Sequence, residues 1–596
     1  MEGASFDERG ASVEPGGRGH LLFAAPVLLA GLALLVWAIP LLGSVGFAYD
    51  DKEAIVSNPV VNGALPPGEA FARDYWHHLE DAGHYRPLAT LLLRADHARA
   101  DGPRPAAFRW TNALLHALVL GLLAAAWRRI ARAHRIPFPW FGLAVLAVHP
   151  ACADVVAWIS GRTSLVSGLG AAAGVLGLTL VARGPAVLTV CLLASLLSLL
   201  GKEDGVVVAA LLPVCAVALV GPNTSAGFCW RRAPWAAAGS TAAVCLYAAL
   251  RTFALGAPFP SSPSAPLSHL GLLERVWTGL AAWTHGFLEF VCFWNPAPPT
   301  MPASALGSDT ALVLGLLCAV LLLATVLALS KNGPARVALI GLCSVLVCIA
   351  PLVQIVPAGE LFAPRFLYQP MIFGVFLLHW LFAALRPALG RSSAWLQGGL
   401  ILGMSAVSVL EAAPRYVSRQ SYWESHLAVE AEDARIWNAV GQARQESADV
   451  KGAMEAYTEA IRIDPQYGAP WSKVGELRAV DGDLEGAADA FHEAIARDPA
   501  AVIARANLAA VLLRLDRPGE ALLIYEEAIS LAPGLAPLHR GRARALWRLD
   551  RVEAAEAAVR ESLRLDPSDD AATRLLRRIE GPRGGLVPAP SPAYRR

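Results

Sequence analysis

Two adjacent carboxylates, Asp50 and Asp51, follow directly on the first long apolar segment of the chain. Residues 21–43 carry no charge and are long enough to cross a bilayer. Carboxylates where such a helix leaves the membrane are costly to place unless solvent, a partner charge or a reaction uses them. A solvated loop is the simpler interpretation of an isolated acidic pair, so a chemical role depends on which other charged residues lie nearby.

Further polar residues stand at the ends of later apolar runs, and each has a structural interpretation as well as a chemical one. They are Arg86, His149, Asp154, Trp158, Arg162, Lys202, Glu203, Arg251, Arg365 and Tyr368. His149 precedes a proline and suits a helix end, Lys202 and Glu203 can pair with each other, and Arg251 can reach lipid headgroups. Trp158 suits an interfacial aromatic belt.

Taken together, these residues indicate a more specific chemistry. Basic groups facing a carboxylate pair at a membrane surface can hold a lipid-linked phosphate, which guanidinium binds in bidentate fashion. A carboxylate beside them can accept the proton of an attacking hydroxyl.

Composition sets the class of protein. The 596 residues exceed one compact domain, 55% of them are hydrophobic, and the mean hydropathy is +0.45. A net charge of +1 gives no indication of nucleic-acid binding. The nine cysteines stand singly without paired-ligand spacing, so they indicate neither a disulfide framework nor a metal site. Few lysines and abundant Ala, Gly, Pro and Arg suggest a bacterial genome rich in GC.

Eleven apolar runs predict a multi-pass membrane domain over 21–412. They lie at 21–43, 108–127, 138–150, 165–182, 185–200, 205–221, 234–252, 309–330, 336–353, 366–386 and 394–412. The run 138–150 is short for a span, and the Trp-rich stretch 272–294 suits a re-entrant helix or a twelfth span.

Basic loops orient these runs. Four arginines within 128–135 belong in the cytoplasm by the positive-inside rule, and later alternate loops carry Arg or Lys as well. The polar, disordered segment 1–20 is then cytoplasmic. Loops 44–107 and 253–308, and everything after 413, fall on the opposite side, together with the candidate site residues.

The C-terminal third is a repeat array. Pro465, Pro499, Pro533 and Pro567 recur every 34 residues, the tetratricopeptide period. One small-residue position is filled by Ala453, Ala487, Ala521 and Ala555, and one large apolar position by Tyr457, Phe491, Tyr525 and Val559. Four repeats and a capping helix therefore occupy 434–580, after a linker at 413–433 and before a disordered tail at 581–596. Such an array makes a concave binding surface and does no chemistry itself.

Five motifs carry a resemblance to a known family. They are FAYDDKEAIVSNPVV (47–61), HYRPL (84–88), VHPACADVVAWISGRTSLV (148–166), LGKEDG (200–205) and FAPRFLYQP (362–370). Followed by tetratricopeptide repeats, they resemble the transmembrane-and-tetratricopeptide-repeat (TMTC-like) family, which includes O-mannosyltransferases of the GT-C glycosyltransferase class. The chain departs from the family pattern at Arg109, where His is usual, and at Pro364, where Glu is usual.

The resemblance implies an all-α protein with a GT-C-like membrane domain and a tetratricopeptide α-solenoid, in the inner membrane of a bacterium. It also implies transfer of a sugar from a polyprenyl-phosphate donor to a hydroxyl of a protein or glycan acceptor outside the cytoplasm. The base falls on Asp50 or Asp51, as in inverting glycosyl chemistry. Arg162, Lys202 and Arg365 would stabilise the leaving phosphate.

Supporting roles fall on Arg86, His149, Asp154, Trp158, Glu203 and Tyr368. The second carboxylate either raises the pKa of its neighbour or holds a divalent cation, Mg²⁺ or Mn²⁺, and no other cofactor is implied.

Two alternatives remain open from the sequence. One is a non-catalytic scaffold whose membrane domain anchors repeats that bind a protein partner. The other is a transporter, which predicts charges at mid-membrane, whereas these runs are almost free of charge.

Overall fold

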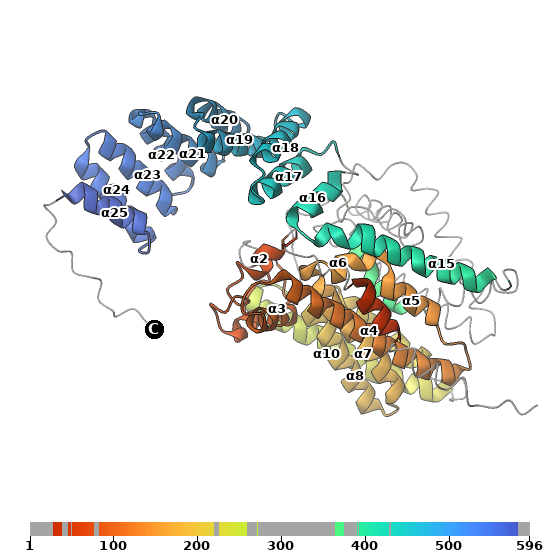
Figure 1. Ribbon diagram of the computed structural model, residues 1–596. Helices are drawn as coiled ribbons and strands as arrows, with labels where there is room; N and C mark the ends of the chain where they lie inside the picture. The colour runs from red at the N-terminus through yellow and green to blue at the C-terminus, as the bar shows by residue number, and fades with distance from the viewer. Residues whose placement is uncertain are drawn as a thin grey trace, which may run out of the picture. The chain divides into compact units, whose positions relative to one another are not determined.

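The computed structural model describes residues 28–37, 46–48, 50–76, 83–219, 226–258, 271, 364–374, 390, 392–427 and 431–581 (Figure 1). All regular structure in these ranges is helical, which confirms the predicted fold class. The chain divides into two compact units, Met1–Ser425 and His426–Arg596. The termini 1–20 and 582–596, the runs 309–330 and 336–353 and the stretch 272–294 lie outside the described residues.

Five helices of the first unit are long and apolar enough to cross a membrane. They are α4 (Pro105–His134), Ile159–Leu180 with η3 (Ile159–Gly161) and α7 (Arg162–Leu180), α8 (Gly184–Gly201), Arg231–Leu255 within α10 (Ala226–Leu255), and Ser392–Tyr416 with α15 (Ser392–Val407), η7 (Ser408–Ala412) and η8 (Ala413–Tyr416). Shorter apolar helices run over Leu28–Trp37 and Gly205–Val217, the latter within α9 (Gly205–Ala218). The predicted count of eleven spans is not confirmed by these residues.

The long helices α4 and α7 run in the same direction, and α10 runs in the opposite one. At one end, Arg129 and Arg232 donate to the carbonyls of Thr179 and Leu178, so the end of α4 and the start of α10 meet the end of α7. At the other end, Arg251 near the end of α10 donates to the Gly83 carbonyl at 2.7 Å. The structure thus places Arg129 and Arg232 at the end of the helix bundle away from the candidate site.

Small residues let these helices approach closely. A Cβ added at Gly170 on α7 would lie 2.3 Å from Ser198 Oγ on α8, and one at Gly239 on α10 would lie 2.3 Å from the Leu188 carbonyl of α8. Glycine is required at both contacts, as is common where membrane helices pack without a hydrophobic driving force.

The predicted run 138–150 forms only a short helix, α5 (Trp140–Val148). At 1.5 Å per residue it is about 14 Å long, roughly half of the hydrocarbon thickness of a bilayer. Its residues from Phe141 onward are buried, so it is a core helix and does not span by itself. The break falls at His149, which is extended, and Pro150, after which the chain continues through η2 (Pro150–Cys152) and α6 (Ala153–Val156).

The first long loop is an ordered cap. It contains α2 (Asp51–Ile55), η1 (Pro67–Phe71) and α3 (Pro87–Arg99). An apolar cluster joins α2 and α3 to the start of α4 and to η3, and it consists of Ala54, Ile55, Val61, Tyr75, Ala89, Leu93, Phe108 and Ile159. This cluster fixes the position of the Asp50–Asp51 pair over the helix ends.

The second unit is the predicted repeat array. Its helices are α17 (Ala434–Glu446), α18 (Val450–Ile463), α19 (Gly468–Asp481), α20 (Leu484–Arg497), α21 (Val502–Arg514), α22 (Pro518–Leu531), α23 (Ala536–Arg548), α24 (Val552–Leu565) and α25 (Asp570–Glu580). Tyr457 packs on Gly441 and Phe491 on Gly475, which shows why the repeat needs a small residue opposite a large one. The helix α16 (Arg419–Leu427) precedes the array within the predicted linker.

Candidate active site

Asp51 is fully buried at the start of α2 and is held by three hydrogen bonds. Its Oδ1 accepts from the Ser160 amide at 2.9 Å and from the Ser160 hydroxyl at 3.1 Å, and its Oδ2 accepts from the Ala48 amide at 3.2 Å. Burial raises the pKa of Asp51 to about 6, although the charge of Arg109 and these hydrogen bonds oppose the rise. Asp51 therefore fastens the first loop to the turn before α7.

Asp50 has a different environment. It is only partly buried, and its Oδ1 accepts a hydrogen bond from Trp158 Nε1 at 3.1 Å. The guanidinium carbon of Arg365 lies 4.7 Å from the centroid of the Trp158 ring. One indole thus contacts both the Asp50 carboxylate at its Nε1 edge and the Arg365 guanidinium over its ring, which brings a carboxylate and a cation to the same side chain.

Asp154 and Tyr416 hold Arg365. The Arg365 Nη1 lies 3.8 Å from Asp154 Oδ2, and the hydroxyl of Tyr416 donates to Asp154 Oδ1. Burial raises the pKa of Asp154 while the charge of Arg365 opposes the rise. A Cβ on Gly161 would lie 2.3 Å from the Asp154 carbonyl, so the tight turn that places Trp158 beside Asp154 requires glycine there.

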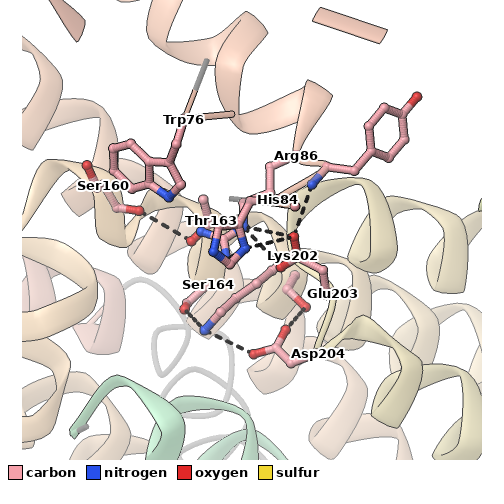
Figure 2. A network of polar contacts seen from close by, with 12 residues as sticks. Trp76, His84, Arg86, Ser160, Thr163, Ser164, Lys202, Glu203 and Asp204 are labelled. Atoms are coloured by element: carbon pink, nitrogen blue, oxygen red, sulfur yellow. Dashed lines mark hydrogen bonds and ion pairs between the residues drawn. The ribbon is translucent and has the colours of Figure 1, made fainter. Parts of the chain in front are cut away.

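Lys202 is a second cationic group near Arg365, since both lie against the Phe366 ring. The Lys202 Nζ lies 3.1 Å from Asp204 Oδ2 and donates to Ser164 Oγ at 3.0 Å (Figure 2). The ring of Phe366 lies 5.2 Å from this ammonium and 5.3 Å from the Arg365 guanidinium carbon. Burial lowers the pKa of Lys202, and the charge of Asp204 opposes that effect.

Glu203 pairs with the first loop and not with Lys202, so the interpretation of a Lys202–Glu203 pair is wrong (Figure 2). Arg86 Nε lies 3.0 Å from Glu203 Oε2, and the Tyr85 amide donates to Oε1 at 3.2 Å. Burial would raise the pKa of Glu203, but the Arg86 guanidinium and His84 hold it well below its usual range. This ion pair clamps residues 84–86 onto the turn between α8 and α9.

Arg162 forms its polar contacts with residues of α3 and α4. It is fully buried, its Nη2 lies 2.6 Å from Asp96 Oδ2, and its Nε donates to Asn112 Oδ1 at 2.8 Å. The same Nη2 donates to the Phe108 carbonyl at 2.7 Å. The guanidinium therefore ties α3, α4 and α7 together.

His149 and Tyr368 also serve contacts within the fold. His149 Nδ1 accepts from the Ala151 amide at 3.2 Å and so caps the turn that follows α5. The Tyr368 hydroxyl lies 2.9 Å from His116 Nδ1, and its ring occupies the space that a side chain at Gly168 would need. These two residues join α4, α5 and α7 near the site.

Sequence reasoning missed Ser160, Asp204 and Tyr416 as residues that build this site, and it singled out Arg109 only as a departure from the family pattern. Arg109 binds the carbonyls of Ala157 at 2.8 Å and Gly46 at 2.9 Å, and it also donates to the Tyr416 carbonyl. The spacing of Ser160, Ser164 and Ser167 along one helix face was a usable signal. Tyr416 offered none, because it lies 262 residues from Asp154 in the sequence.

The described residues offer no group of three or more His, Cys, Asp or Glu side chains placed to hold a metal ion. The surroundings of Asp51 also disfavour one, since N–H and O–H donors occupy both of its oxygens. The divalent cation considered from the sequence stays a prediction.

Comparisons with known proteins find relatives of this chain. A family model described as "Tetratricopeptide repeat" matches residues 434–467. Protein O-mannosyl-transferase Tmtc2 of Drosophila melanogaster is 34% identical over 129 residues, which are 20% of this chain and 13% of that protein. Protein O-mannosyl-transferase TMTC3 of Mus musculus is 22% identical over 457 residues, 70% of this chain and 49% of that protein.

Among solved structures, MamA 41-end from Desulfovibrio magneticus RS-1 is 21% identical, with 25% of this chain and 83% of that chain covered and a TM-score of 0.24, too low to carry an inference. The matches span less than half the length of the curated relatives named above. They support a TMTC-like family for this chain.

Proposed function

We propose that this TMTC-like membrane protein is a GT-C type glycosyltransferase that moves a sugar from a polyprenyl-phosphate donor to a hydroxyl of a protein or glycan. The relatives are named protein O-mannosyl-transferases, so mannose is the sugar to test first. The observation that carries the proposal is the placement of Asp50 and Arg365 on the same Trp158 indole.

Asp50 is the proposed base. It is the less buried of the two carboxylates, whereas the three hydrogen bonds of Asp51 fit a positioning role. The acceptor hydroxyl gives its proton to Asp50 as its oxygen forms a bond to the anomeric carbon. The bond from that carbon to the phosphate oxygen breaks, and the electron pair leaves with the phosphate, so the configuration inverts.

Arg365 and Lys202 are the proposed phosphate-binding groups. They share the Phe366 ring, and each has a carboxylate that holds its cationic head, Asp154 for Arg365 and Asp204 for Lys202. Fixed cations placed where negative charge develops lower the barrier without reorganising during the step. We reassign Arg162 to a positioning role, because its buried guanidinium already binds Asp96, Asn112 and the Phe108 carbonyl.

The arginines within 128–135 and at Arg231 and Arg232 favour a cytoplasmic position for the helix ends that carry them. The site and the repeats would then lie on the outer side of a bacterial inner membrane. Tetratricopeptide repeats indicate protein–protein interaction, so the array would bring an acceptor or a partner protein to the enzyme.

A non-catalytic anchor for the repeats is the second candidate. Against it stands the cost of burying charge, which amounts to several kcal/mol per ion even in a relaxed protein. Asp154, Lys202 and Arg365 are all largely buried in the site, and an anchor has no need of them.

The deciding test supplies membranes containing the full chain with a panel of polyprenyl-phospho-sugars and a peptide rich in Ser and Thr. We expect transfer from one donor, with the polyprenyl-phospho-mannose as the leading candidate. Well-folded protein that transfers no sugar from any donor would favour the anchor.

A further inference from the structure

The first helices of the repeats form a separate layer of the array. Helix α19 contacts α21, α21 contacts α23 and α23 contacts α25. Figure 1 shows these odd-numbered helices along one side of the array and α20, α22 and α24 along the other. Helices on the inside of a curved stack lie closer together than those outside, so the odd-numbered helices line the concave surface.

Charge is segregated between the two layers of the third and fourth repeats. The first helices α21 and α23 contain arginines and neither Asp nor Glu. The second helix α22 contains Glu520, Glu526 and Glu527 and no basic residue. The two arginines of α24 pair with glutamates of the same helix, Arg560 with Glu556 at 2.5 Å and Arg564 with Glu561 at 2.6 Å. In the part of the chain that the structure describes, Arg505, Arg540 and Arg548 of these first helices pair with carboxylates. No ion pair neutralises Arg514, Arg542 or Arg544 there, so net positive charge remains on the concave side.

A stripe of exposed side chains carries this charge. On α23 it runs through Arg544, Trp547 and Arg548, and Arg544 shares a face with the other two because they follow it by three and four residues. On α21 it runs from Ile503, with 70% of its surface exposed, to Arg514. Exposed Arg574 continues it on α25. We call Arg514, Arg544, Arg548 and Arg574 the arginine stripe.

The stripe has room for further anions. Arg548 lies 3.0 Å from Asp516, and Arg514 donates to the Ala479 carbonyl at 2.7 Å. Within the described residues, neither Arg514 nor Arg544 forms an ion pair with a carboxylate. Large apolar side chains are exposed on the same helices, namely Ile503 on α21 and Trp547 on α23, the latter 38% exposed. This combination of guanidinium and apolar surface suits a polypeptide with acidic and apolar residues.

We propose that the arginine stripe binds an extended acidic segment of a partner polypeptide. Packed helices lie about 8–10 Å apart, and an extended chain advances about 3.3 Å per residue, so about three residues span one helix spacing. A segment with Glu or Asp at every third position and apolar residues between them therefore matches α21, α23 and α25 in turn. The proposal concerns the repeats alone and stands whether or not the membrane unit transfers sugar.

The test measures binding of a fluorescent peptide, about ten residues long, to the full chain in discs of neutral lipid. The peptide carries Glu at every third position and Leu and Ser elsewhere, and the comparison peptide has Gln in place of Glu. We expect the Glu peptide to bind at least about tenfold more tightly than the Gln peptide. This difference in affinity should shrink at high salt, since screening weakens exposed charge pairs.

Two variants locate the binding. Arg544→Glu should weaken binding of the Glu peptide by about tenfold or more. Arg564→Glu, which changes an exposed arginine on α24, should leave the binding affinity unchanged. Unaltered helical circular dichroism of both variants confirms that the array is folded. Equal binding of the Gln peptide, no effect of Arg544→Glu, or Arg544-dependent binding to anionic vesicles in place of the peptide would each overturn the proposal.

Discussion

Asp50 and Asp51 are neighbours in the chain but have opposite surroundings. Asp51 is enclosed by the Ser160 and Ala48 donors, and Asp50 lies at the more open edge beside the Trp158 indole. The difference arises because α2 begins between them and turns Asp51 towards the buried turn before α7. A positioning residue and a proposed base therefore follow one another directly.

The raised pKa of Asp51, about 6, predicts a pH-dependent contribution to stability. The unfolded carboxyl titrates near its ordinary value of 3.8, so between about pH 4 and 6 the folded protein keeps a proton that the unfolded chain releases. This group therefore lowers stability as pH rises through that window, by up to about 1.4 kcal/mol per pH unit.

Replacing Asp51 by Asn removes that titration. We expect the Tm of the variant in detergent to fall less than that of the wild type between pH 4 and pH 6. The exposed Asp101 offers a control, Asp101→Asn, because its left-handed backbone accepts Asn. Parallel pH profiles for wild type and Asp51→Asn would contradict the raised pKa.

At the scale of elements, the segment from η8 to α16 contacts the candidate site and holds its parts together. The Val417 carbonyl accepts from the Gly46 amide at 3.2 Å, and Arg419 lies 3.7 Å from Glu53. Tyr416 reaches Asp154 from the same segment. These residues belong to the linker predicted from the sequence, and their contacts join it to the loop that carries Asp50. The compact first unit accordingly extends to Ser425.

Tyr416→Phe tests whether this segment positions Arg365. Removing the hydroxyl takes a hydrogen bond from Asp154, and hydrogen bonds to charged groups contribute about 1.5–3 kcal/mol. We expect the KM for the lipid-linked donor to rise by about tenfold or more, with a smaller effect on kcat. The reason is that Asp154 then holds Arg365, the proposed ligand of the donor phosphate, less firmly. Tyr457→Phe, at a buried tyrosine of the repeats, is the control. An unchanged KM for the donor in Tyr416→Phe would remove this role.

In the molecule as a whole, the sequence was most informative where its signal repeats or is local. The period of 34 residues predicted the array, and the apolar runs predicted α4, α7, α8 and α10. Contacts between segments that are distant in the sequence could not be predicted from it. Nothing local indicates that Tyr416 bonds Asp154 or that Asp96 takes the guanidinium of Arg162, because the fold alone brings these residues together.

Deleting residues 434–580 separates chemistry from recruitment. The membrane unit keeps its own core and the proposed site, so transfer to a small acceptor at saturating concentration should persist. Transfer to a protein acceptor at low concentration should weaken, because the array no longer raises the local acceptor concentration. Equal loss on both acceptors would mean that the repeats support the membrane fold, and no loss on either would mean that they serve another partner.

The most direct test of the proposed chemistry measures turnover in Asp50→Asn. The substitution keeps the shape of the side chain and removes the proton acceptor, so kcat for sugar transfer should fall by at least about a hundredfold. The Tm should hardly change, and Asp101→Asn should transfer at the rate of the wild type. Full turnover by Asp50→Asn, with donor and acceptor saturating, would contradict base catalysis by Asp50.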